Sequence, residues 1–336
     1  MNRLNKFFYY FIVLISFLVI VVSLLSLSYN NTRWWMKAMD FPRVQYLVVA
    51  FTCLVIFGLR NRRWTFWPVF LIIGLLATVV IQGRFIFPYT PLTPPKVASL
   101  PSAQVDASER VRLMLANVYM YNREADALLD IVQQADPDML LLMENDQWWI
   151  DHVAPLRERY PHHHELPIDN TYGLALYSRY PFKGLITKFF QHDSVPSFHC
   201  EVQLPSGRWF SFHGVHPVPP ILSEHPDNKG QREKELVKVG ALVKERSLPT
   251  VVAGDFNDVA WSNTSRLFQV SGELEDTRVG RGLFASFDAK SWIMRWPLDH
   301  VYVSDEFRVV SFRRLGYFGS DHFPLYVELA LPGVEE

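Results

Sequence analysis

Three apolar segments within the first 84 residues place the strongest constraint on how this chain of 336 residues can fold. Residues 7–27 contain no charged side chain, and an α-helix needs ~20 such residues to cross a bilayer. Residues 44–59 form a shorter apolar segment. Residues 66–81 form a third, which Trp64 and Trp67 extend with side chains suited to a membrane interface. The sequence therefore predicts membrane-spanning helices.

A cleaved signal peptide is the alternative interpretation of the first apolar segment. No small-residue cleavage motif follows Leu27, and two further apolar segments come after it. We therefore predict a membrane anchor of three transmembrane helices over residues 1–84. The chain is expected to be a multi-pass protein of an inner or plasma membrane, with the membrane itself as a partner.

Positive charges near the apolar segments indicate an orientation, because cytoplasmic loops carry an excess of Lys and Arg. Cations precede the first segment and separate the second from the third: Arg3, Lys6, Arg60, Arg62 and Arg63. Both regions are therefore expected in the cytoplasm. The remaining loop would face outward although it also carries cations, namely Arg33, Lys37 and Arg43. After three spans, the rest of the chain is expected in the periplasm or the exterior.

Charge is divided unevenly along the chain. Residues 1–100 hold 10 Lys and Arg against one acid, whereas residues 101–336 hold 23 Lys and Arg against 33 acids, a net charge of −10. Because a basic surface drives affinity for nucleic acids, this charge disfavours a nucleic-acid partner without excluding a local basic patch. Cys53 lies in an apolar segment and Cys200 stands alone, so no disulfide is expected within a domain.

Residues 85–108 are predicted to form an extended linker, since they contain five prolines. From residue 109 to 332 we predict one domain in which strands and helices alternate. The predicted strands are residues 111–118, 139–143, 173–178, 209–215, 250–253, 300–304 and 325–329, and the predicted helices are residues 125–135 and 231–246. Many strands with few helices favour two packed sheets that are flanked by helices.

Polar clusters follow the ends of the predicted strands. They are Asn117 with Glu144, His216, Gly254-Asp255-Phe256-Asn257, and Ser320-Asp321-His322-Phe323-Pro324. Glu144 follows a continuous apolar run, which is typical of a buried strand. A carboxylate there points toward the crevice where open sheets bind ligands, and its oxygens suit Mg²⁺. Taken alone, Glu144 can equally be a solvated acid and Asn117 a turn residue.

The two later clusters combine carboxylates with an amide and an imidazole. Asp255 and Asn257 are two positions apart, so on an extended chain both face one side and can hold a water, a phosphate oxygen or a metal. An ordinary turn is the alternative. Asp321 and His322 are adjacent and face opposite ways, so Asp321 can bind metal while His322 faces substrate. Asp299, at the start of a strand, is the candidate acid that fixes the tautomer of His322.

Other histidines carry weaker signals. His216 ends a strand, whereas His213 falls on the opposite face of that strand and is expected in the core. The run of residues 162–164 consists of three histidines, but no Cys or acid pair stands at ligand spacing. We therefore predict that this run is a loop and not a metal site.

Taken together, these clusters resemble the endonuclease/exonuclease/phosphatase superfamily. The segment Gly173-Leu174-Ala175-Leu176-Tyr177-Ser178-Arg179 is similar to the family pattern Gly-x-Ala-x-x-Ser-(Arg/Lys). The resemblance covers residues from about 110 to 331, and membrane-tethered bacterial members of the family have a similar layout. It implies an α/β fold, a four-layer α/β/β/α sandwich like that of deoxyribonuclease I, preceded by the three transmembrane helices. The site then lies at the edge between the two sheets.

The resemblance also implies a metal site. Carried over residue by residue, Glu144 would bind Mg²⁺, with Mn²⁺ as a substitute, and Asp321 and Asn117 would lie nearby. Asn117 would also contact substrate. The family often adds a carboxylate partner for its first histidine, which the sequence does not identify here, and Glu201 is only a weak candidate for that partner.

The remaining roles that the resemblance implies are catalytic. His322, paired with Asp299, would activate or orient water. Asp255 and Asn257 would position the nucleophile and the scissile phosphate, and His216 would stabilise charge on the phosphoryl oxygens. Positioning and electrostatic stabilisation account for most of the barrier reduction in phosphoryl transfer.

We therefore expect a membrane-anchored, Mg²⁺-dependent phosphoesterase that hydrolyses a phosphodiester or phosphomonoester outside the cytoplasm. A lipid or small-molecule substrate is preferred because of the anchor and the acidic charge. The alternatives are an extracytoplasmic nuclease for DNA or RNA and a catalytically silent membrane scaffold. No obligate protein partner is evident. Trp292, Met294 and Trp296 precede Asp299 and form either a rim that faces substrate or membrane, or part of the core.

Overall fold

The computed structural model divides into two compact units, residues 1–88 and 89–336. It describes residues 3–28, 34–61, 64–190, 194–219, 231–245 and 247–333. Three of the cations used to predict the orientation lie outside these residues, namely Arg33, Arg62 and Arg63.

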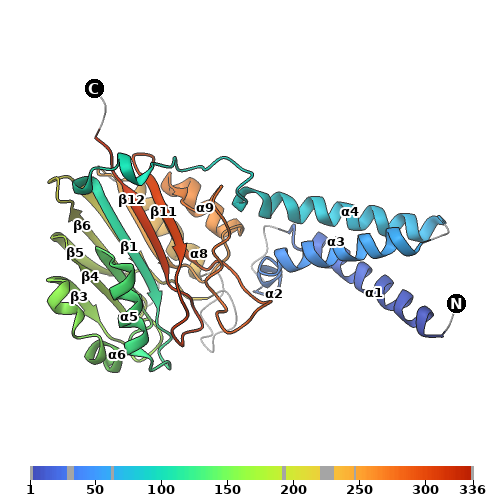
Figure 1. Cartoon of the computed structure of the whole chain (residues 1–336), viewed down its shortest axis with the longest axis horizontal. Coiled ribbons are helices and arrows are strands. Elements are labelled where there is room, and N and C mark those ends of the chain that lie inside the picture. Colours follow the sequence, from blue (N-terminus) through green and yellow to red (C-terminus); the bar gives the residue numbers. More distant parts are fainter. Residues whose placement is uncertain are drawn as a thin grey trace. The chain divides into compact units, whose positions relative to one another are not determined.

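The first unit contains three helices that are long and apolar enough to cross a membrane (Figure 1). They are α1 (Arg3–Leu25), α3 (Arg43–Arg60) and α4 (Phe66–Ile86), and a short helix, α2 (Trp34–Ala38), precedes α3. Each of the three apolar segments thus forms one helix. Arg43 is buried among them, where it donates hydrogen bonds to Gln82 Oε1 (2.9 Å) and Ser26 O (2.9 Å) and pairs with Asp40.

The second unit is built on two six-stranded sheets. The first has the order β11-β12-β1-β2-β4-β3, with β1 (Arg110–Asn117), β2 (Met139–Met143), β3 (His162–Leu166), β4 (Leu174–Ser178), β11 (Arg308–Arg314) and β12 (Leu325–Ala330). The second has the order β5-β6-β7-β8-β10-β9, with β5 (Phe182–Phe189), β6 (Pro196–Gln203), β7 (Trp209–Val215), β8 (Thr250–Asp255), β9 (Glu275–Asp276) and β10 (Asp299–Val303).

Helices cover the outer face of each sheet (Figure 1). The first sheet packs against α5 (Ala125–Ala135), α6 (Gln147–His152) and α7 (Leu156–Arg159), and the second against α8 (Gln231–Lys244) and α9 (Asn263–Gly272). The fold is therefore the four-layer α/β/β/α sandwich that the sequence predicts.

Alternation along the central strands explains why their sequences are apolar without interruption. In β2, Leu141 packs into the core between the two sheets, whereas Leu140 and Leu142 pack under the helices of the first sheet. Successive side chains of a strand point to opposite faces, so a strand covered on both faces needs apolar residues at every position. This burial holds the ends of β1 and β2 in place.

Most of residues 85–108, for which the sequence predicts an extended linker, belong to the second unit, which begins at Tyr89. From Tyr89 onward the segment packs against the second unit, with the Tyr89 hydroxyl donating to Ala260 O (2.8 Å). Val97 is buried in the core between the sheets, and Arg281 donates to Val97 O (2.7 Å). The prolines keep this stretch extended, but tertiary contacts hold it to the second unit.

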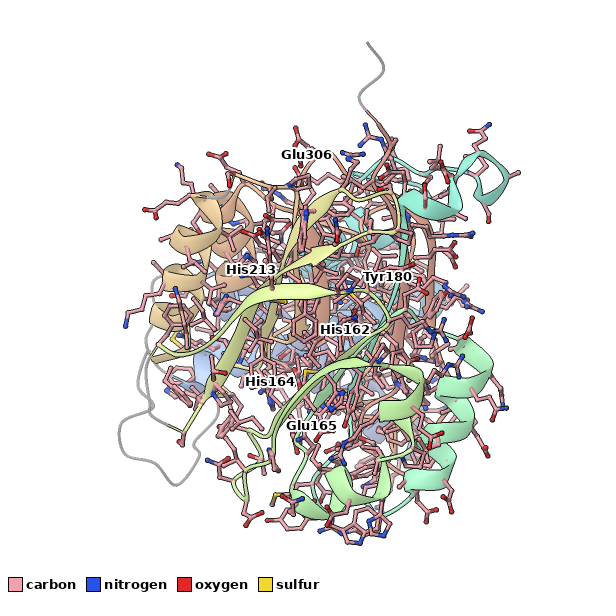
Figure 2. All side chains as sticks on the ribbon, turned by 90° about the vertical axis from the view of Figure 1, so that its left-hand side faces the viewer. His162, His164, Glu165, Tyr180, His213 and Glu306 are labelled. Carbon is pink, nitrogen blue, oxygen red and sulfur yellow. The ribbon has the colours of Figure 1, made fainter. Side chains whose placement is uncertain are left out.

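Residues 162–164 are not a loop, as the sequence analysis predicted, but lie in the edge strand β3, which pairs with β4 (Figure 2). The side chains of a half-exposed strand alternate, so three polar residues in a row are tolerated there. His213, by contrast, is buried on the second sheet as expected.

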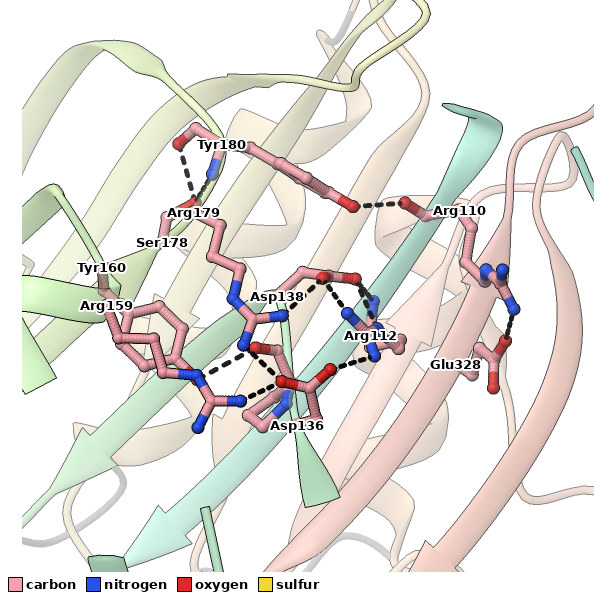
Figure 3. Close-up of polar contacts among 11 residues, drawn as sticks. Arg110, Arg112, Asp136, Asp138, Arg159, Tyr160, Ser178, Arg179, Tyr180 and Glu328 are labelled. Carbon is pink, nitrogen blue, oxygen red and sulfur yellow. Dashed lines mark hydrogen bonds and ion pairs between the residues drawn. The ribbon is translucent and has the colours of Figure 1, made fainter. Parts of the chain in front are cut away.

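A cluster of ion pairs lies at the edge of the first sheet where β1 and β2 begin (Figure 3). The buried carboxylate of Asp138 accepts hydrogen bonds from Arg112 N (2.9 Å) and Arg112 Nε (2.9 Å). Asp136 pairs with Arg112, Arg159 and Arg179, and the hydrogen bond from Arg179 is the main reason why its pKa is lowered. These contacts lie at the opposite end of β1 from Asn117.

Candidate active site

The candidate site forms where strands of both sheets end. Asn117 is the last residue of β1, and Glu144 directly follows β2, which runs parallel to β1. In the second sheet, Asp255 ends β8 and is paired in register with Asp299, the first residue of β10. His216 directly follows β7, which is parallel to β8. The two sheets thus bring residues from distant parts of the sequence to one edge.

Asn117 links the two sheets through its side-chain amide. Its Nδ2 atom donates to Glu144 Oε1 (2.9 Å) and to Asp255 Oδ2 (3.0 Å). Its Oδ1 atom accepts from Tyr119 N (3.0 Å), which orients the amide. Asn117 therefore holds the carboxylates of two different sheets side by side.

Glu144 adopts a left-handed backbone conformation, with φ of +62°. Such a conformation costs a non-glycine residue about 1 kcal/mol or more and is found most often at functional sites. The adjacent strand accommodates this turn, because a Cβ atom at Gly173 would lie 1.8 Å from Asn145 O. Glycine at position 173, which the family pattern contains, is thus required where the chain passes the backbone of Asn145, directly after Glu144.

Burial raises the pKa of Glu144 to about 7. The hydrogen bond from Asn117 and the charge of His322 oppose this rise, whereas the nearby carboxylates of Asp321 and Asp255 add to it. Burial also raises the pKa of Asp321. This concentration of carboxylates and its oxygen donors fit a divalent cation, which would relieve their mutual repulsion.

His322 lies between two buried aspartates. Its Nδ1 atom is 2.8 Å from Asp299 Oδ2, and its Nε2 atom is 3.5 Å from Asp255 Oδ2. Burial alone would lower the pKa of His322, but the two carboxylates outweigh it and raise that pKa to about 10. One ligand atom from each of these three residues lies within 4.8 Å of the others, so this group is a second set that can hold a metal.

The chain forms a turn after β8, and this turn keeps Asp255 and Asn257 next to the candidate site. Asp255 Oδ1 accepts a hydrogen bond from Asn257 N (2.7 Å), as in an Asx turn, and Asn257 has φ of +51°. Asn257 Nδ2 donates to Pro217 O (2.9 Å), next to His216. Gly254 is needed where β8 passes close to the end of β7, since a Cβ atom at position 254 would lie 1.9 Å from Val215 O.

His216 is buried, and its Nε2 atom lies 3.8 Å from Asp255 Oδ2. Burial lowers the pKa of His216 although the charge of Asp255 opposes this shift. Among the residues that the structure describes, none forms a hydrogen bond with His216 Nδ1. Glu201 is not its partner, because Glu201 lies within β6 and pairs with Lys183 at 3.3 Å.

Ser320 positions Asp321 and His322, a role that its place in the motif did not reveal. Its hydroxyl donates to Asn117 O (2.8 Å) and accepts from His322 N (3.0 Å). Ser286 was missed altogether, and its hydroxyl accepts from Asp299 N (3.2 Å). A single serine in a loop carries no sequence signal for such a contact.

Comparisons with known proteins agree with this geometry. The model of the Endonuclease/Exonuclease/phosphatase family matches residues 114–322. No curated protein matches the chain. Among solved structures, D. rerio TDP2 complexed with a single-strand DNA product has a TM-score of 0.55 at 15% identity, covering 66% of this chain and 98% of that one. The human Nocturnin catalytic domain with bound sulfate has a TM-score of 0.53 at 18% identity, covering 68% and 97%.

An endonuclease/exonuclease/phosphatase from Bacteroides vulgatus has a TM-score of 0.54 at 16% identity, covering 66% of this chain and 99% of that one. At these identities the solved structures show a shared fold. The family match extends from β1 to His322 and so contains every residue of the candidate site. The chain therefore belongs to the endonuclease/exonuclease/phosphatase family, whose members are metal-dependent hydrolases of phosphoester bonds.

Proposed function

We propose that this protein is a membrane-anchored, Mg²⁺-dependent phosphoesterase that acts on a phosphodiester or phosphomonoester outside the cytoplasm. The observation that carries the proposal is the contact of Asn117 with both Glu144 and Asp255, since it holds two carboxylates that could bind a cation near the hydrogen-bonded pair of His322 and Asp299. A lipid or small-molecule substrate is preferred. The three apolar helices and the net charge of −10 in residues 101–336 support this preference.

In this proposal, Glu144 and Asp321 hold Mg²⁺, with Asn117 beside them. The group of Asp255, Asp299 and His322 is the less suitable site, because His322 at its raised pKa carries a proton and already bonds to Asp299. A bound Mg²⁺ would neutralise charge on the phosphoryl oxygens. Mn²⁺ prefers the same oxygen donors and is expected to substitute.

The proposed roles of the other residues follow from their contacts. Asp299 accepts from His322 Nδ1, so His322 Nε2 points toward Asp255 and the reacting centre. His322 Nε2 orients or activates the attacking water beside Asp255. Asp255 and Asn257 position this water and the scissile phosphate, and His216 donates to the phosphoryl oxygens.

A nuclease is the second candidate, and the likeness to a TDP2 complexed with a single-strand DNA product favours it. That likeness concerns the fold alone. The acidic charge of residues 101–336 argues against an extended binding surface for a nucleic-acid backbone. Lipid and nucleic-acid substrates therefore have to be compared directly.

The test is a substrate screen of the purified full chain in detergent with Mg²⁺. The substrates are an aryl phosphodiester, phospholipids, sphingomyelin, plasmid DNA and RNA, each with the Glu144→Ala variant as the control. We expect hydrolysis of a lipid or small phosphoester that chelation removes and added Mg²⁺ restores. Hydrolysis of DNA or RNA alone would favour the nuclease, and activity that survives both chelation and Glu144→Ala would refute the metal site.

A further inference from the structure

A short hairpin of residues 287–296 lies next to the candidate active site. The backbones of Phe287 and Trp296 bond to each other in both directions, with Phe287 N donating to Trp296 O at 3.0 Å. Asp288 N donates to Met294 O (3.2 Å). These bonds make residues 289–293 the turn of the hairpin.

The base of the hairpin is joined to the segment that carries the catalytic histidine. Ala289 N donates to Asp321 O (2.7 Å), and Phe287 forms a backbone bridge with His322. The rings of Phe287 and His322 are 4.9 Å apart.

The end of the hairpin carries three consecutive apolar side chains that are exposed to solvent, Trp292 and Ile293 in the turn and Met294 directly after it, and we name them the apolar tip. Trp292 is 91% exposed, Ile293 75% and Met294 45%. Trp292 is the most exposed large apolar side chain among the residues that the structure describes. Single exposed apolar residues are common, but a contiguous group beside an active site indicates a binding surface.

Two cations of the hairpin, Lys290 and Arg295, flank the apolar tip in the sequence, and Arg314 contacts the same Phe323 ring as Arg295; we name the three the basic flank. Lys290 Nζ lies 4.5 Å from the centre of the Tyr119 ring, and the guanidinium groups of Arg295 and Arg314 lie 5.0 Å and 4.4 Å from that of Phe323. Within the described part of the chain, none of the three pairs with a carboxylate. The unit as a whole is acidic, so this local positive charge stands out against it.

We propose that the apolar tip inserts into the headgroup region of an anionic bilayer and places a lipid phosphoester at the Glu144 and His322 site. An aromatic residue with aliphatic neighbours and flanking Lys and Arg is the composition of a membrane interface. The same chain has three helices that are long and apolar enough to cross a membrane, so a bilayer is the expected partner of the apolar tip. The choice of a lipid substrate rests on the proposed function, whereas insertion of the tip does not.

Nucleic acid fits the apolar tip less well. Single-stranded nucleic acid binds to aromatic rings on which successive bases stack. Only Trp292 of the three offers such a ring, and Ile293 and Met294 have no stacking face. Their contribution is apolar area, which a bilayer can cover.

The first experiment measures insertion without reference to activity. The full chain carries an environment-sensitive fluorophore on Ile293→Cys, in nanodiscs of equal amounts of phosphatidylethanolamine and phosphatidylglycerol. Val270→Cys, an exposed apolar position on α9, is the matched control, and the native Cys53 and Cys200 are buried. We expect a blue shift and quenching by brominated lipid at position 293 only. Equal responses at both positions, or a response at 293 to a DNA oligonucleotide but not to lipid, would overturn insertion.

The second experiment measures what the apolar tip does for catalysis. The variant Trp292→Ser/Ile293→Ser/Met294→Ser should lose at least about tenfold in kcat/KM for a lipid phosphoester in nanodiscs, since one large apolar contact is worth that much. It should hydrolyse a water-soluble aryl phosphodiester like the wild type, because the tip lies outside the catalytic cluster. Equal losses on both substrates would overturn the delivery role. Lipid quenching at position 293 in a wild-type chain that hydrolyses only soluble substrates would support insertion and refute the lipid substrate class.

Discussion

At the scale of single residues, the site depends on how His322 is held. Asp299 accepts from Nδ1, and Nε2 faces Asp255 at 3.5 Å. Both aspartates and the histidine are buried, so water does not weaken their interactions. The consequences can be measured by changing one hydrogen-bonding atom at a time.

The variant Asp299→Asn should slow turnover by about 10²–10⁴-fold, because an amide group can donate to Nδ1 and so favours the wrong tautomer. The double variant with His322→Ala should be little slower than the worse single variant, since residues that act as a unit are not additive. Steady-state kinetics of the four proteins provide the measurement. Asp305→Asn, at an exposed position after β10, is the control and should retain full activity. Additive losses would show that the two residues act separately.

Glu144→Gln should abolish turnover while the fold persists. The amide keeps a hydrogen-bonding partner near Asn117 but removes the charge that a divalent cation requires. Metal titration by calorimetry should show that Mg²⁺ and Mn²⁺ binding is lost together with activity. Glu158→Gln, an exposed position on α7, should change neither. Tight metal binding by Glu144→Gln would place the cation at Asp255, Asp299 and His322 instead.

At the scale of elements, two clusters far from the site stabilise the sheets. Asp138 is buried and bonds to the side chain and backbone of Arg112, and this contact fixes the start of β1 against β2. Replacing Asp138 with Ala should cost ~1–3 kcal/mol, because Arg112 loses the acceptor of its backbone N and Nε atoms although Asp136 still pairs with its guanidinium group. Urea unfolding of the full chain in detergent provides the measurement. The folded fraction of the Asp138→Ala variant should keep the wild-type kcat. A variant with a lower kcat but an unchanged free energy of unfolding would contradict this structural role.

The second cluster makes stability depend on pH. His199 Nδ1 and His213 Nδ1 are 2.7 Å apart between β6 and β7, a hydrogen bond that needs one unprotonated nitrogen. Burial, with the charge of Lys188 added, lowers the pKa of His213 to about 4 and that of His199 to about 2. Their ordinary value is about 6.5, so the unfolded chain binds more protons below that pH.

The contribution of this pair to the free energy of unfolding should therefore be constant above pH 6.5 and fall between pH 6.5 and 4, by ~1.4 kcal/mol per pH unit for each histidine. Urea unfolding across this pH range tests the expectation. The double variant His199→Leu/His213→Leu should flatten the curve, since an apolar pair has no proton to bind. If the difference in free energy of unfolding between the wild type and this double variant does not change across the window, the pair does not cause the pH dependence.

At the scale of the whole molecule, the three apolar helices of the first unit support the predicted anchor and raise the question of its orientation. Of the cations that argued against the assigned orientation, Arg43 is buried and paired with Asp40, so it counts less as a loop charge than the sequence suggested. A reporter enzyme that is active only outside the cytoplasm, fused after Gly333, should be active. Strong activity from a cytoplasmic reporter at the same position would reverse the orientation.

The division of the chain at residue 89 also matters for experiments. Tyr89 and Val97 pack within the second unit, so a soluble version that begins at residue 105 would remove buried contacts. A version that begins at residue 89 keeps them. The prolines of this stretch indicate extended structure, but no local pattern shows whether an extended segment is free or packed.

The sequence alone determined the properties that depend on near neighbours. Length and apolarity predicted the three helices of the anchor, and uninterrupted apolar runs predicted β2 and β8, because burial on both faces needs such residues. The polar residues at strand ends identified the family and the candidate site. Edge strands such as β3 and β5 were missed, since their exposed positions leave no apolar pattern.

Only the tertiary structure decided which of these residues meet. The hydrogen bond between Asn117 and Asp255 joins positions 138 residues apart, and its geometry depends on the register of strands in two different sheets. The same packing separated Glu201 from His216 and left Trp292 in solvent while Val97 became buried. The apolar character of Trp292 and Val97 makes burial favourable for both side chains, but the arrangement of the layers decides which of the two is buried.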